Sequence, residues 1–336
     1  MEETTDERAR CKRIDSLCRD GRKGYAMSPH ANRREALFGG LCLCCLPTLG
    51  RSAEAFGLDE VAPGIFVRRG IDGEASADNA DAIANIGFIV GRDSVLVTES
   101  GGSRADGAWL RAEIRKRTDK PISHVVLTHV HPDHCFGASA FSEDKPVFIG
   151  HHALRGALEA RGDFYRQRLE DLLGAEKAGN VIYPTMEVKD AAEIDLGGRK
   201  LSFHAHGTAH TNCDLSMLDS ESGLLFPADL LFVHRIPSLD GSLLGWFKEI
   251  ERLKTFGAKR AVPGHGPTTV DLEPALADIT RYLTALRDET RKAVSSGVSI
   301  EKAMQTVAQD ERGKWALFDS YNPRNVTQAY KELEWE

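Results

Sequence analysis

Hydrophobic residues recur at short intervals in the first half of the chain beyond residue 56, in runs separated by Gly, Asp and Pro. Such runs are typical of β-strands bounded by turns. Ser103 is placed to cap a helix that ends near Thr118, and Pro121 stops the chain before a buried strand. The pattern predicts strands at residues 64–67, 86–90, 95–97, 125–127 and 147–149, with a tight turn at 91–93. A sheet is therefore expected to form first.

The second half of the chain alternates between helical and strand spacing. Leu154, Leu158 and later leucines recur at helical intervals, which predicts a long helix after the strand at 147–149. Further elements are expected as strands at 200–203, 215–218, 223–226 and 260–262, a hairpin turn at 219–222, and helices at 242–256 and around Leu276, Ile279, Leu283 and Leu286. No tandem repeat or flexible linker divides this stretch, so we expect one domain over residues 56–336 with a C-terminal helical extension.

A short apolar segment near the N-terminus has the features of a signal peptide. Arg33 and Arg34 precede the apolar residues 36–50, and small residues follow at positions 53 and 55. The apolar run is too short to span a bilayer, and this order of charge, apolar run and small residues is that of a cleavable export signal. We therefore expect residues 27–55 to direct the chain to the periplasm and to be removed after residue 55.

Alternatives to this interpretation concern the export route and the local structure. The paired arginines favour the twin-arginine (Tat) route, while the loose match of the residues after them leaves the Sec route open. A buried N-terminal helix would have to accommodate Gly39, Gly40 and Pro47, which are poor helix residues. Residues 1–26 are charged and lack a hydrophobic period, so we interpret them as a disordered or over-extended segment before Met27.

Composition restricts the partners of the chain. Its 336 residues carry 50 acidic and 43 basic side chains, a net charge of −7, which leaves no basic excess to neutralise nucleic-acid phosphates. No apolar run approaches the length of a membrane span, so no stable span is expected after cleavage. Five of the seven cysteines lie in the first 45 residues. The other two, Cys135 and Cys213, are expected to be free buried thiols rather than a disulfide or metal ligands.

Residues 128–134 read Thr-His-Val-His-Pro-Asp-His and directly follow the buried strand 125–127. A strand end that turns into a helix start can direct His129 and His131 at one metal ion. Asp133 and His134 then face a second ion nearby. Without metal, each of these bunched polar groups would need its own partner, so the motif predicts a metal site.

Three more residues with metal-binding side chains lie at the ends of predicted strands or turns. They are His210, Asp229 and His265. The ordered set, HxHxDH followed by His, Asp and His, resembles the metallo-β-lactamase-fold hydrolase superfamily over roughly residues 60–290. The resemblance implies an α/β fold, a four-layer αββα sandwich with the metals at one edge of two mixed sheets.

The resemblance also assigns the ligands of two divalent ions. It implies a first site of His129, His131 and His210, a second site of Asp133, His134 and His265, and Asp229 as the carboxylate that bridges them. Zinc is the expected metal, and the same ligands also suit iron or manganese.

Two positions distinguish this chain within the superfamily it resembles. Asp229 stands where many class B β-lactamases have cysteine, which favours chemistry like that of glyoxalase II over β-lactam hydrolysis. Glu99 stands where the superfamily usually has an aspartate that supports the ligands. The longer side chain is expected to change that supporting contact and not the metal binding itself.

A closer resemblance is to the quinoprotein relay system zinc metallohydrolases, exported proteins associated with alcohol dehydrogenases that use pyrroloquinoline quinone. It rests on the signal peptide and on the segments 234–237, 240–242, 245–246, 325–326 and 332–336. The resemblance implies a periplasmic dehydrogenase partner, and it supplies no substrate.

The remaining histidines differ in what their positions predict. His234 and its neighbour Arg235 follow Asp229 in a loop with Pro and Gly that should border the metal cleft, so we expect both to contact substrate. Structural roles are expected for His151 and His152, which follow a strand, and for His124, His204 and His206, which lie on strands.

Together the motifs predict an exported hydrolase in which a metal-bridging hydroxide attacks an ester, thioester, lactone or related bond of a small molecule. Asp133 is expected to orient this nucleophile and to accept its proton. The alternative is a metal-loaded binding or relay protein that handles a quinone-type cofactor, or serves a dehydrogenase partner, without hydrolytic turnover. The intact ligand set favours the hydrolase, because a carrier has no need of an open site with two metals.

Overall fold

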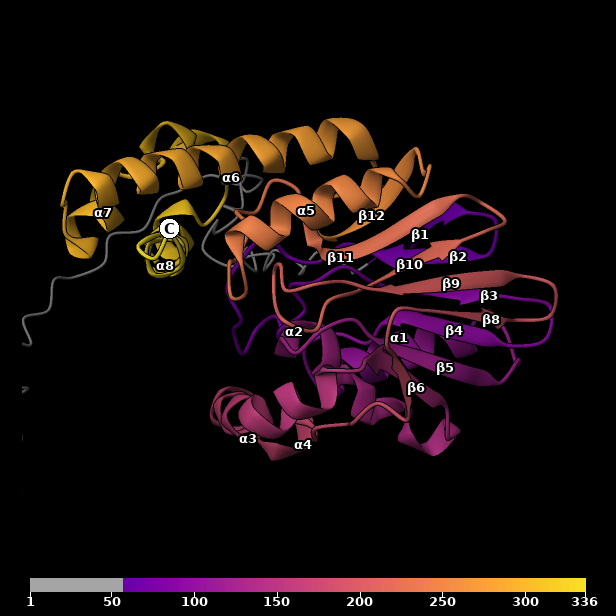
Figure 1. The fold of residues 1–336 in the computed structure, drawn as a ribbon. Coiled ribbons are helices and arrows are strands. Elements are labelled where there is room, and N and C mark those ends of the chain that lie inside the picture. The colour runs from indigo at the N-terminus through magenta and orange to yellow at the C-terminus, as the bar shows by residue number, and fades with distance from the viewer. Residues whose placement is uncertain (1–56) are drawn as a thin grey trace, which may run out of the picture. The chain divides into compact units, whose positions relative to one another are not determined.

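Two β-sheets packed face to face form the centre of the computed structural model, which describes residues 57–336 (Figure 1). The predicted N-terminal segment 1–26, the signal peptide 27–55 and its cleavage site lie outside the described residues. In the first sheet the strands follow chain order: β1 (Asp59–Ala62), β2 (Ile65–Arg68), β3 (Ile86–Val90), β4 (Val95–Glu99), β5 (Ile122–Leu127), β6 (Val147–His151) and β7 (Met186–Val188). The second has the order β13 (Val270–Asp271), β12 (Arg260–His265), β11 (Leu224–Phe232), β10 (Leu215–Asp219), β9 (Lys200–Ala205) and β8 (Ala191–Asp195).

Helices cover the outer face of each sheet, which gives the expected four layers (Figure 1). The first sheet contacts α1 (Arg104–Arg115) and α3 (Leu154–Leu173), and the second contacts α5 (Leu243–Lys254) and α6 (Leu272–Ser295). The remaining helical elements are α2 (Pro132–Cys135), η2 (Phe136–Asp144), α4 (Ala175–Ala178), α7 (Ile300–Thr306), η3 (Gln309–Lys314) and α8 (Phe318–Leu333). The α/β sandwich predicted from the sequence is confirmed.

Each interface between layers has its own apolar core. Between the sheets, Ile65 and Leu96 of the first pack in one cluster with Phe203 and Met217 of the second. Outside the first sheet, Leu110 and Ile114 of α1 pack on its other face. Because both faces of the central strands are covered, β4 is buried at every position and begins with the apolar residues Val95, Leu96 and Val97. Sheets of this kind hold the loops at their ends in fixed positions.

The outer core of the second sheet is built by α5, α6 and the C-terminal helices. Trp246 of α5 and Leu276 of α6 are fully buried there, with Val326 of α8 in the same cluster. Ser242 begins α5 as expected, since its hydroxyl accepts a hydrogen bond from the Gly245 N–H at 2.9 Å. The helices after α6 therefore belong to the same apolar core as the second sheet.

Helix α8 also holds the loop that follows β11. The Asn325 amide accepts from the Leu239 N–H at 2.9 Å and donates to the Pro237 carbonyl at 2.7 Å. Glu332 accepts from the Ser242 hydroxyl at 2.6 Å. Because these bonds anchor the loop at both ends, the residues between them are fixed relative to the ends of the strands.

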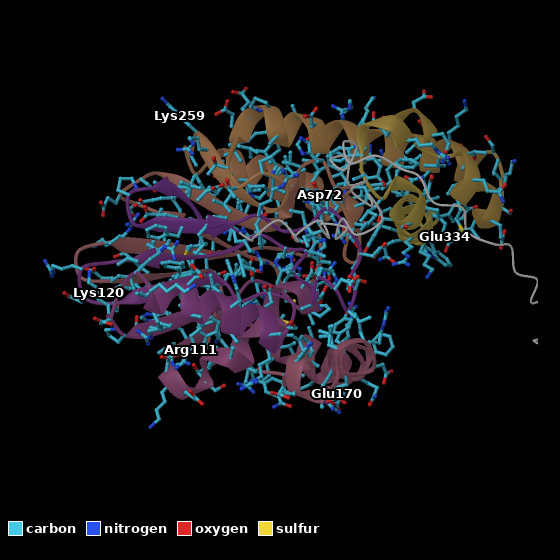
Figure 2. The ribbon with its side chains drawn as sticks, turned by 180° about the vertical axis from the view of Figure 1, so that it is seen from behind. Asp72, Arg111, Lys120, Glu170, Lys259 and Glu334 are labelled. Carbon is cyan, nitrogen blue, oxygen red and sulfur yellow. The ribbon has the colours of Figure 1, made fainter. Side chains whose placement is uncertain are left out.

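Charged side chains of both signs project from the outside of the molecule, among them Lys120, Glu170, Lys259 and Glu334 (Figure 2). Within residues 57–336, no helix has the length and apolar character needed to cross a membrane.

Candidate metal centre

The HxHxDH motif lies where β5 ends and α2 begins. The Leu215 N–H donates to the Thr128 carbonyl at 2.9 Å, which ties the end of β5 to β10 of the other sheet. His131 has an extended backbone and precedes Pro132, whose fixed φ suits the first position of a helix. The turn sends the side chains before and after Pro132 in different directions, as the two-metal interpretation requires.

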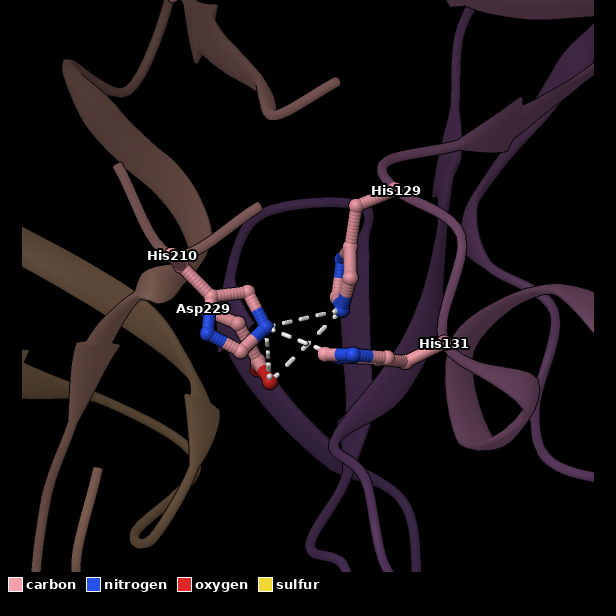
Figure 3. Close-up of side chains that lie close together, drawn as sticks. All are labelled: His129, His131, His210 and Asp229. Atoms are coloured by element: carbon pink, nitrogen blue, oxygen red, sulfur yellow. Dashed lines mark hydrogen bonds and ion pairs between the residues drawn. The ribbon is translucent and has the colours of Figure 1, made fainter. Parts of the chain in front are cut away.

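Four side chains from three segments form the first group of this centre (Figure 3). The Nε2 atom of His210 lies 2.9 Å from Nδ1 of His131 and 3.3 Å from Nε2 of His129. Asp229 completes the group, and one potential ligand atom from each of the four side chains lies within 4.8 Å of every other. This is the grouping expected for the first metal, with Asp229 added.

Asp133, His134 and His265 form the second group, with ligand atoms that also lie within 4.8 Å of one another. An oxygen of Asp133 is 3.3 Å from Nε2 of His265 and 3.5 Å from Nε2 of His134. The three residues are those expected to hold the second metal.

Asp229 lies between the two groups. Its Oδ2 atom is 3.4 Å from Nε2 of His210 and 3.7 Å from Nε2 of His129 in the first group. Toward the second group, Oδ1 is 3.1 Å from Nε2 of His134, and Oδ2 is 3.5 Å from Nε2 of His265. One carboxylate thus faces both groups, which is the position of a bridging ligand.

Local backbone geometry brings Asp229 to this position. The pairing of β11 with β12 shifts register on both sides of Ala228, and Ala228 has a positive φ of 48°. Such irregularities re-aim side chains within a sheet. At Gly264 on β12, a Cβ atom would lie 1.9 Å from Oδ1 of Asp229, so the close approach of the two strands requires glycine.

Hydrogen bonds behind the histidines fix which ring nitrogen faces the centre. His210 Nδ1 contacts the Ser238 carbonyl at 2.6 Å, and His265 Nδ1 contacts the Ile83 carbonyl at 2.9 Å. In both rings Nδ1 must therefore carry the proton, which leaves the Nε2 lone pair directed at the other ligands. His131 is reversed, because its Nε2 faces Asp240 at 3.3 Å and its Nδ1 faces the group.

Several buried polar atoms of the centre have no hydrogen-bond partner within the described residues. They are both ring nitrogens of His134, Oδ1 of Asp229 and both carboxylate oxygens of Glu99. Glu99 Oε1 lies 3.3 Å from Nδ1 of His134, so the longer side chain does reach a ligand from behind. Buried charged groups are normally paired or bind metal. The residues present therefore fit divalent cations.

The electrostatic environment favours the metal-binding forms of His129, His210 and Asp229. Burial lowers the pKa of His210 to about 3 and that of His129 well below its usual value, so both rings are neutral. Burial would raise the pKa of Asp229, but His134 and His265 hold it well below its usual range. Burial would lower the pKa of His134, but the carboxylates around it, Asp229 first, raise that pKa well above its usual value. Neutral imidazoles and ionised carboxylates are the forms that bind divalent metals.

The two expected substrate-contact residues occupy different environments. Arg235 is buried and donates to the Gly73 carbonyl at 2.9 Å and to the Tyr321 hydroxyl at 3.1 Å. Burial and then the positive charge of Arg235 act to lower the pKa of His265, but the carboxylates of Asp229 and Asp133 outweigh them, so that this pKa is raised. His234, on the same turn, is exposed and has a positive φ of 66°. The direct contact of either residue with a substrate stays a prediction.

The sequence did not identify a cavity of about 560 Å³ that opens beside His131. Its walls include Arg161 and Phe164 of α3 and Arg324 of α8. Asp240 was noted in the sequence as part of a family-like segment, and its contact with His131 gives it a positioning role. No local sequence spacing could reveal this cavity, because its lining residues are far apart in the chain. The first, His131, and the last, Gln328, are 197 residues apart.

The two expected thiols lie close to this centre without taking part in it. Cys135 and Cys213 are both buried and free. Burial raises the pKa of Cys213 to about 12 and that of Cys135 well above its usual value. Both are therefore unreactive thiols, as the sequence predicted.

Comparisons with known proteins agree with this geometry. Residues 80–265 match the sequence profile of the Metallo-beta-lactamase superfamily. The chain is similar to the linear primary-alkylsulfatase of Pseudomonas sp. (strain ATCC 19151), with 23% identity over 255 residues that cover 64% of this chain and 48% of the relative. The chain thus spans about half the length of that curated relative.

Two solved structures share the fold. A metallo-beta-lactamase from Pontibacter korlensis superposes with a TM-score of 0.56 at 16% identity, over 68% of this chain and 99% of that one. The stereoselective inverting sec-alkylsulfatase from Pseudomonas sp. gives a TM-score of 0.65 at 16% identity, over 82% of this chain and 50% of that one. At these identities the likeness concerns the fold.

Proposed function

The chain belongs to the metallo-beta-lactamase superfamily of hydrolases, and from that premise we propose that it hydrolyses an ester, thioester, lactone or related bond with two divalent metal ions, zinc in the first place. The observation that carries this proposal is the position of Asp229, whose carboxylate faces both ligand groups at once. A carboxylate shared in this way is typical of a site built for two ions rather than one.

Bound divalent ions would supply Lewis acidity, which polarises the bond to be cleaved and makes water acidic enough to react near neutral pH. The protein's own residues then position the reactants. Asp133, the least buried member of the second group, is placed to orient the attacking water and to accept its proton at the carboxylate. Asp240 keeps the His131 ring oriented by contacting Nε2 from the side of the cavity.

Sulfate esters are a second candidate within the same class of reaction. The relative named a linear primary-alkylsulfatase and the sec-alkylsulfatase fold both match this chain, the latter over 82% of its length. A β-lactam is disfavoured because the bridging position holds the carboxylate of Asp229 where many class B β-lactamases have cysteine.

The test is turnover by the zinc-loaded full-length chain on a panel of ester, thioester, lactone, sulfate ester and β-lactam substrates. We expect turnover on at least one of the first four, which a chelator abolishes and which His129→Ala lacks. Glu221→Ala, an exposed carboxylate on the turn between β10 and β11, is the matched control. If zinc is bound and no substrate is turned over, the alternative of a binding or relay protein for a quinone-type cofactor is favoured.

We also propose that the protein serves a quinoprotein dehydrogenase in the periplasm. We propose that it reaches the periplasm by the Tat route. Support comes from Arg33, Arg34 and the apolar run after them. Replacing both arginines with lysine should trap the precursor in the cytoplasm, because the Tat route depends on that pair. Normal export of the lysine variant, with Phe56 at the mature N-terminus, would indicate the Sec route.

A further inference from the structure

The cavity beside His131 is bounded by α3, α8 and the loop between β11 and α5, and we call it the α3–α8 cleft. Its lining comprises His131, Ala160, Arg161, Phe164, Tyr165, Ser238, Leu239, Asp240, Arg324, Thr327 and Gln328. We propose that this cleft binds the body of the substrate and selects an amphiphilic organic anion, with Arg324 as the group that recognises the oxyanion. This inference rests on the proposed function and names the substrate class of that site.

The charges that line the cleft do not cancel. Arg161 forms an ion pair with Asp240, the carboxylate that also contacts His131. Arg324 is exposed and has no ion pair with any carboxylate in residues 57–336; its guanidinium lies 5.2 Å from the ring centroid of Tyr321. Because Asp240 already contacts both Arg161 and His131, the cleft offers one uncompensated positive charge, that of Arg324, and no free acidic group.

A second arginine stands against the same aromatic ring. Arg235 lies 5.3 Å from the centroid of Tyr321, and its buried guanidinium donates to the Gly73 carbonyl and to the Tyr321 hydroxyl. Two guanidinium groups near one ring raise the local positive potential. It is offset in part by Glu74, whose carboxylate accepts from the Tyr321 hydroxyl at 3.0 Å, and by Asp81 and Asp133 on the side of the buried Arg235. The potential favours an anion at the mouth of the cleft.

Part of the lining of the cleft is apolar. Phe164 is 60% exposed and lines the cleft together with Tyr165, whose ring centroid lies 5.8 Å from that of Phe164. Arg168, one helical turn further along α3, places its guanidinium 5.7 Å from the Phe164 ring. An apolar chain or ring that covered Phe164 would remove this aromatic surface from water, which stabilises the complex.

The dimensions of the cleft fit a small molecule. About 560 Å³ lies in the range of small-molecule sites, and one of the lining residues, His131, is a predicted metal ligand. A ligand whose apolar part covers Phe164 and whose oxyanion meets Arg324 therefore lies next to the metal centre. A guanidinium binds carboxylate and sulfate oxygens alike through paired N–H donors, so the shared chemistry is an organic oxyanion.

A neutral and an anionic substrate with the same leaving group test whether the cleft selects anions. The zinc-loaded protein is assayed on two p-nitrophenyl esters with the same leaving group, the neutral butyrate and the anionic hemiglutarate. Arg324→Gln should lower kcat/KM for the anionic ester about tenfold more than for the neutral ester, chiefly through KM, because an ionic hydrogen bond to substrate is lost. Arg324→Lys should recover part of the difference, since it keeps the charge without the fork.

The control is Arg287→Gln. Arg287 also lies over an aromatic ring, that of Phe247 at 4.8 Å, but it is not part of the cleft. It should leave the ratio between the two esters unchanged. An equal loss on both esters in Arg324→Gln, or a ratio unchanged from wild type, would overturn the proposal.

Binding measurements separate this inference from the hydrolase proposal. Calorimetry with 4-phenylbutyrate, hexyl sulfate and the neutral 4-phenylbutanol requires no turnover. We expect at least one anion to bind wild-type protein more tightly than the alcohol and to lose about tenfold in affinity in Arg324→Gln but not in Arg287→Gln. That result with no turnover on any substrate of the panel would reject the hydrolase and keep the anion site, whereas anion affinity independent of Arg324 would reject the site.

Discussion

Two clusters of histidine and carboxylate in this protein have the same residue types and opposite character. At the end of β9, His206 Nδ1 contacts Glu249 at 2.6 Å and Nε2 contacts the Ser216 hydroxyl at 2.7 Å. A neutral His206 satisfies both contacts, by donating at Nδ1 and accepting at Nε2. In the metal centre, the nitrogens of His134 lie 3.3 Å from Glu99 Oε1 and 3.1 Å from Asp229 Oδ1, but neither contact has the geometry of a hydrogen bond.

The difference shows which feature identifies a functional site. The order Glu249, His206, Ser216 has the contacts of a nucleophilic triad, but Ser216 is 1% exposed and does not line the α3–α8 cleft. Its polar groups are satisfied within the protein, as expected from the sequence for a histidine on a strand. The metal centre instead combines unsatisfied buried atoms with an adjoining cavity. Residue types alone therefore do not distinguish a structural network from a site that binds a ligand.

The largest effect is expected when the carboxylate that the two ligand groups share, that of Asp229, is removed. Asp229→Ala should reduce bound zinc from two ions to fewer than one per chain and lower turnover by more than about 100-fold, since even residues behind the ligands contribute 10–100-fold. Elemental analysis of the purified protein measures the metal directly. A chelator should lower the Tm of wild type and leave that of the variant nearly unchanged, because only a bound metal stabilises the native state.

Glu221→Ala should keep both ions and the wild-type Tm. Two full equivalents of zinc in Asp229→Ala would show that this carboxylate does not bridge the sites.

A smaller effect is expected from the carboxylate behind the second group. Glu99→Gln keeps the length of the side chain but removes the negative charge that faces Nδ1 of His134 at 3.3 Å. We expect the affinity for the second ion to fall about 10–100-fold, with the first ion retained. Competition against a metal-binding dye measures the two steps separately. Unchanged affinity for the second ion would mean that Glu99 does not support His134.

The sequence predicted the metal centre better than its surroundings because the ligands carry local signals. Four of the seven ligands stand within six residues after an apolar strand, and each of the others follows a recognisable strand or turn. The limits of β3 were predicted residue for residue, since its apolar run is buried on both faces. Local pattern is sufficient where burial is continuous and the chemistry is concentrated.

Elements that depend on distant contacts were not predicted. Strand β8 (Ala191–Asp195) is largely exposed and has one large apolar residue, so it forms because β9 pairs with it. The ion pair of Arg161 with Asp240 and the placement of Arg324 join segments that no local spacing relates. The sequence predicted the residues that form the two ligand groups, while the shape of the α3–α8 cleft is a property of tertiary packing.

The cluster of His206, Glu249 and Ser216 should respond in the opposite way to the metal centre: its disruption should lower stability and leave zinc binding unchanged. Glu249→Ala removes the acceptor for His206 Nδ1 and for the Gly207 N–H at 3.1 Å. Leaving these donors without a partner should lower the free energy of unfolding by about 1–3 kcal/mol, while zinc content and turnover stay at wild-type values. Urea unfolding measures the change in the free energy of unfolding, and elemental analysis measures the zinc content.

Glu251→Ala, on the exposed side of the same helix, is the control and should change stability by less than about 0.5 kcal/mol. Loss of zinc in Glu249→Ala alone would connect the two clusters and contradict their independence.

The smallest effect is expected at His151, which lies beside the cluster of His206 and Glu249. Its Nε2 contacts the His206 carbonyl at 3.2 Å, and its Nδ1 accepts from the Ala153 N–H at 3.0 Å. Burial, with the charge of His152, lowers the pKa of His151 to about 4. The unfolded chain has a histidine pKa of about 6.5, so below that pH the unfolded state takes up a proton that the native state does not. Stability should therefore fall as pH drops from about 6.5 toward 4, by about 1 kcal/mol between about pH 7 and about pH 5.5 from this residue.

His151→Gln can still donate to the carbonyl but cannot titrate, so the difference in unfolding free energy between these two pH values should be smaller in the variant by that amount. Acid also weakens metal binding, but both proteins share that loss, and it cancels when their pH dependences are subtracted. Identical pH dependence in the two proteins would mean that His151 is not held neutral by its burial.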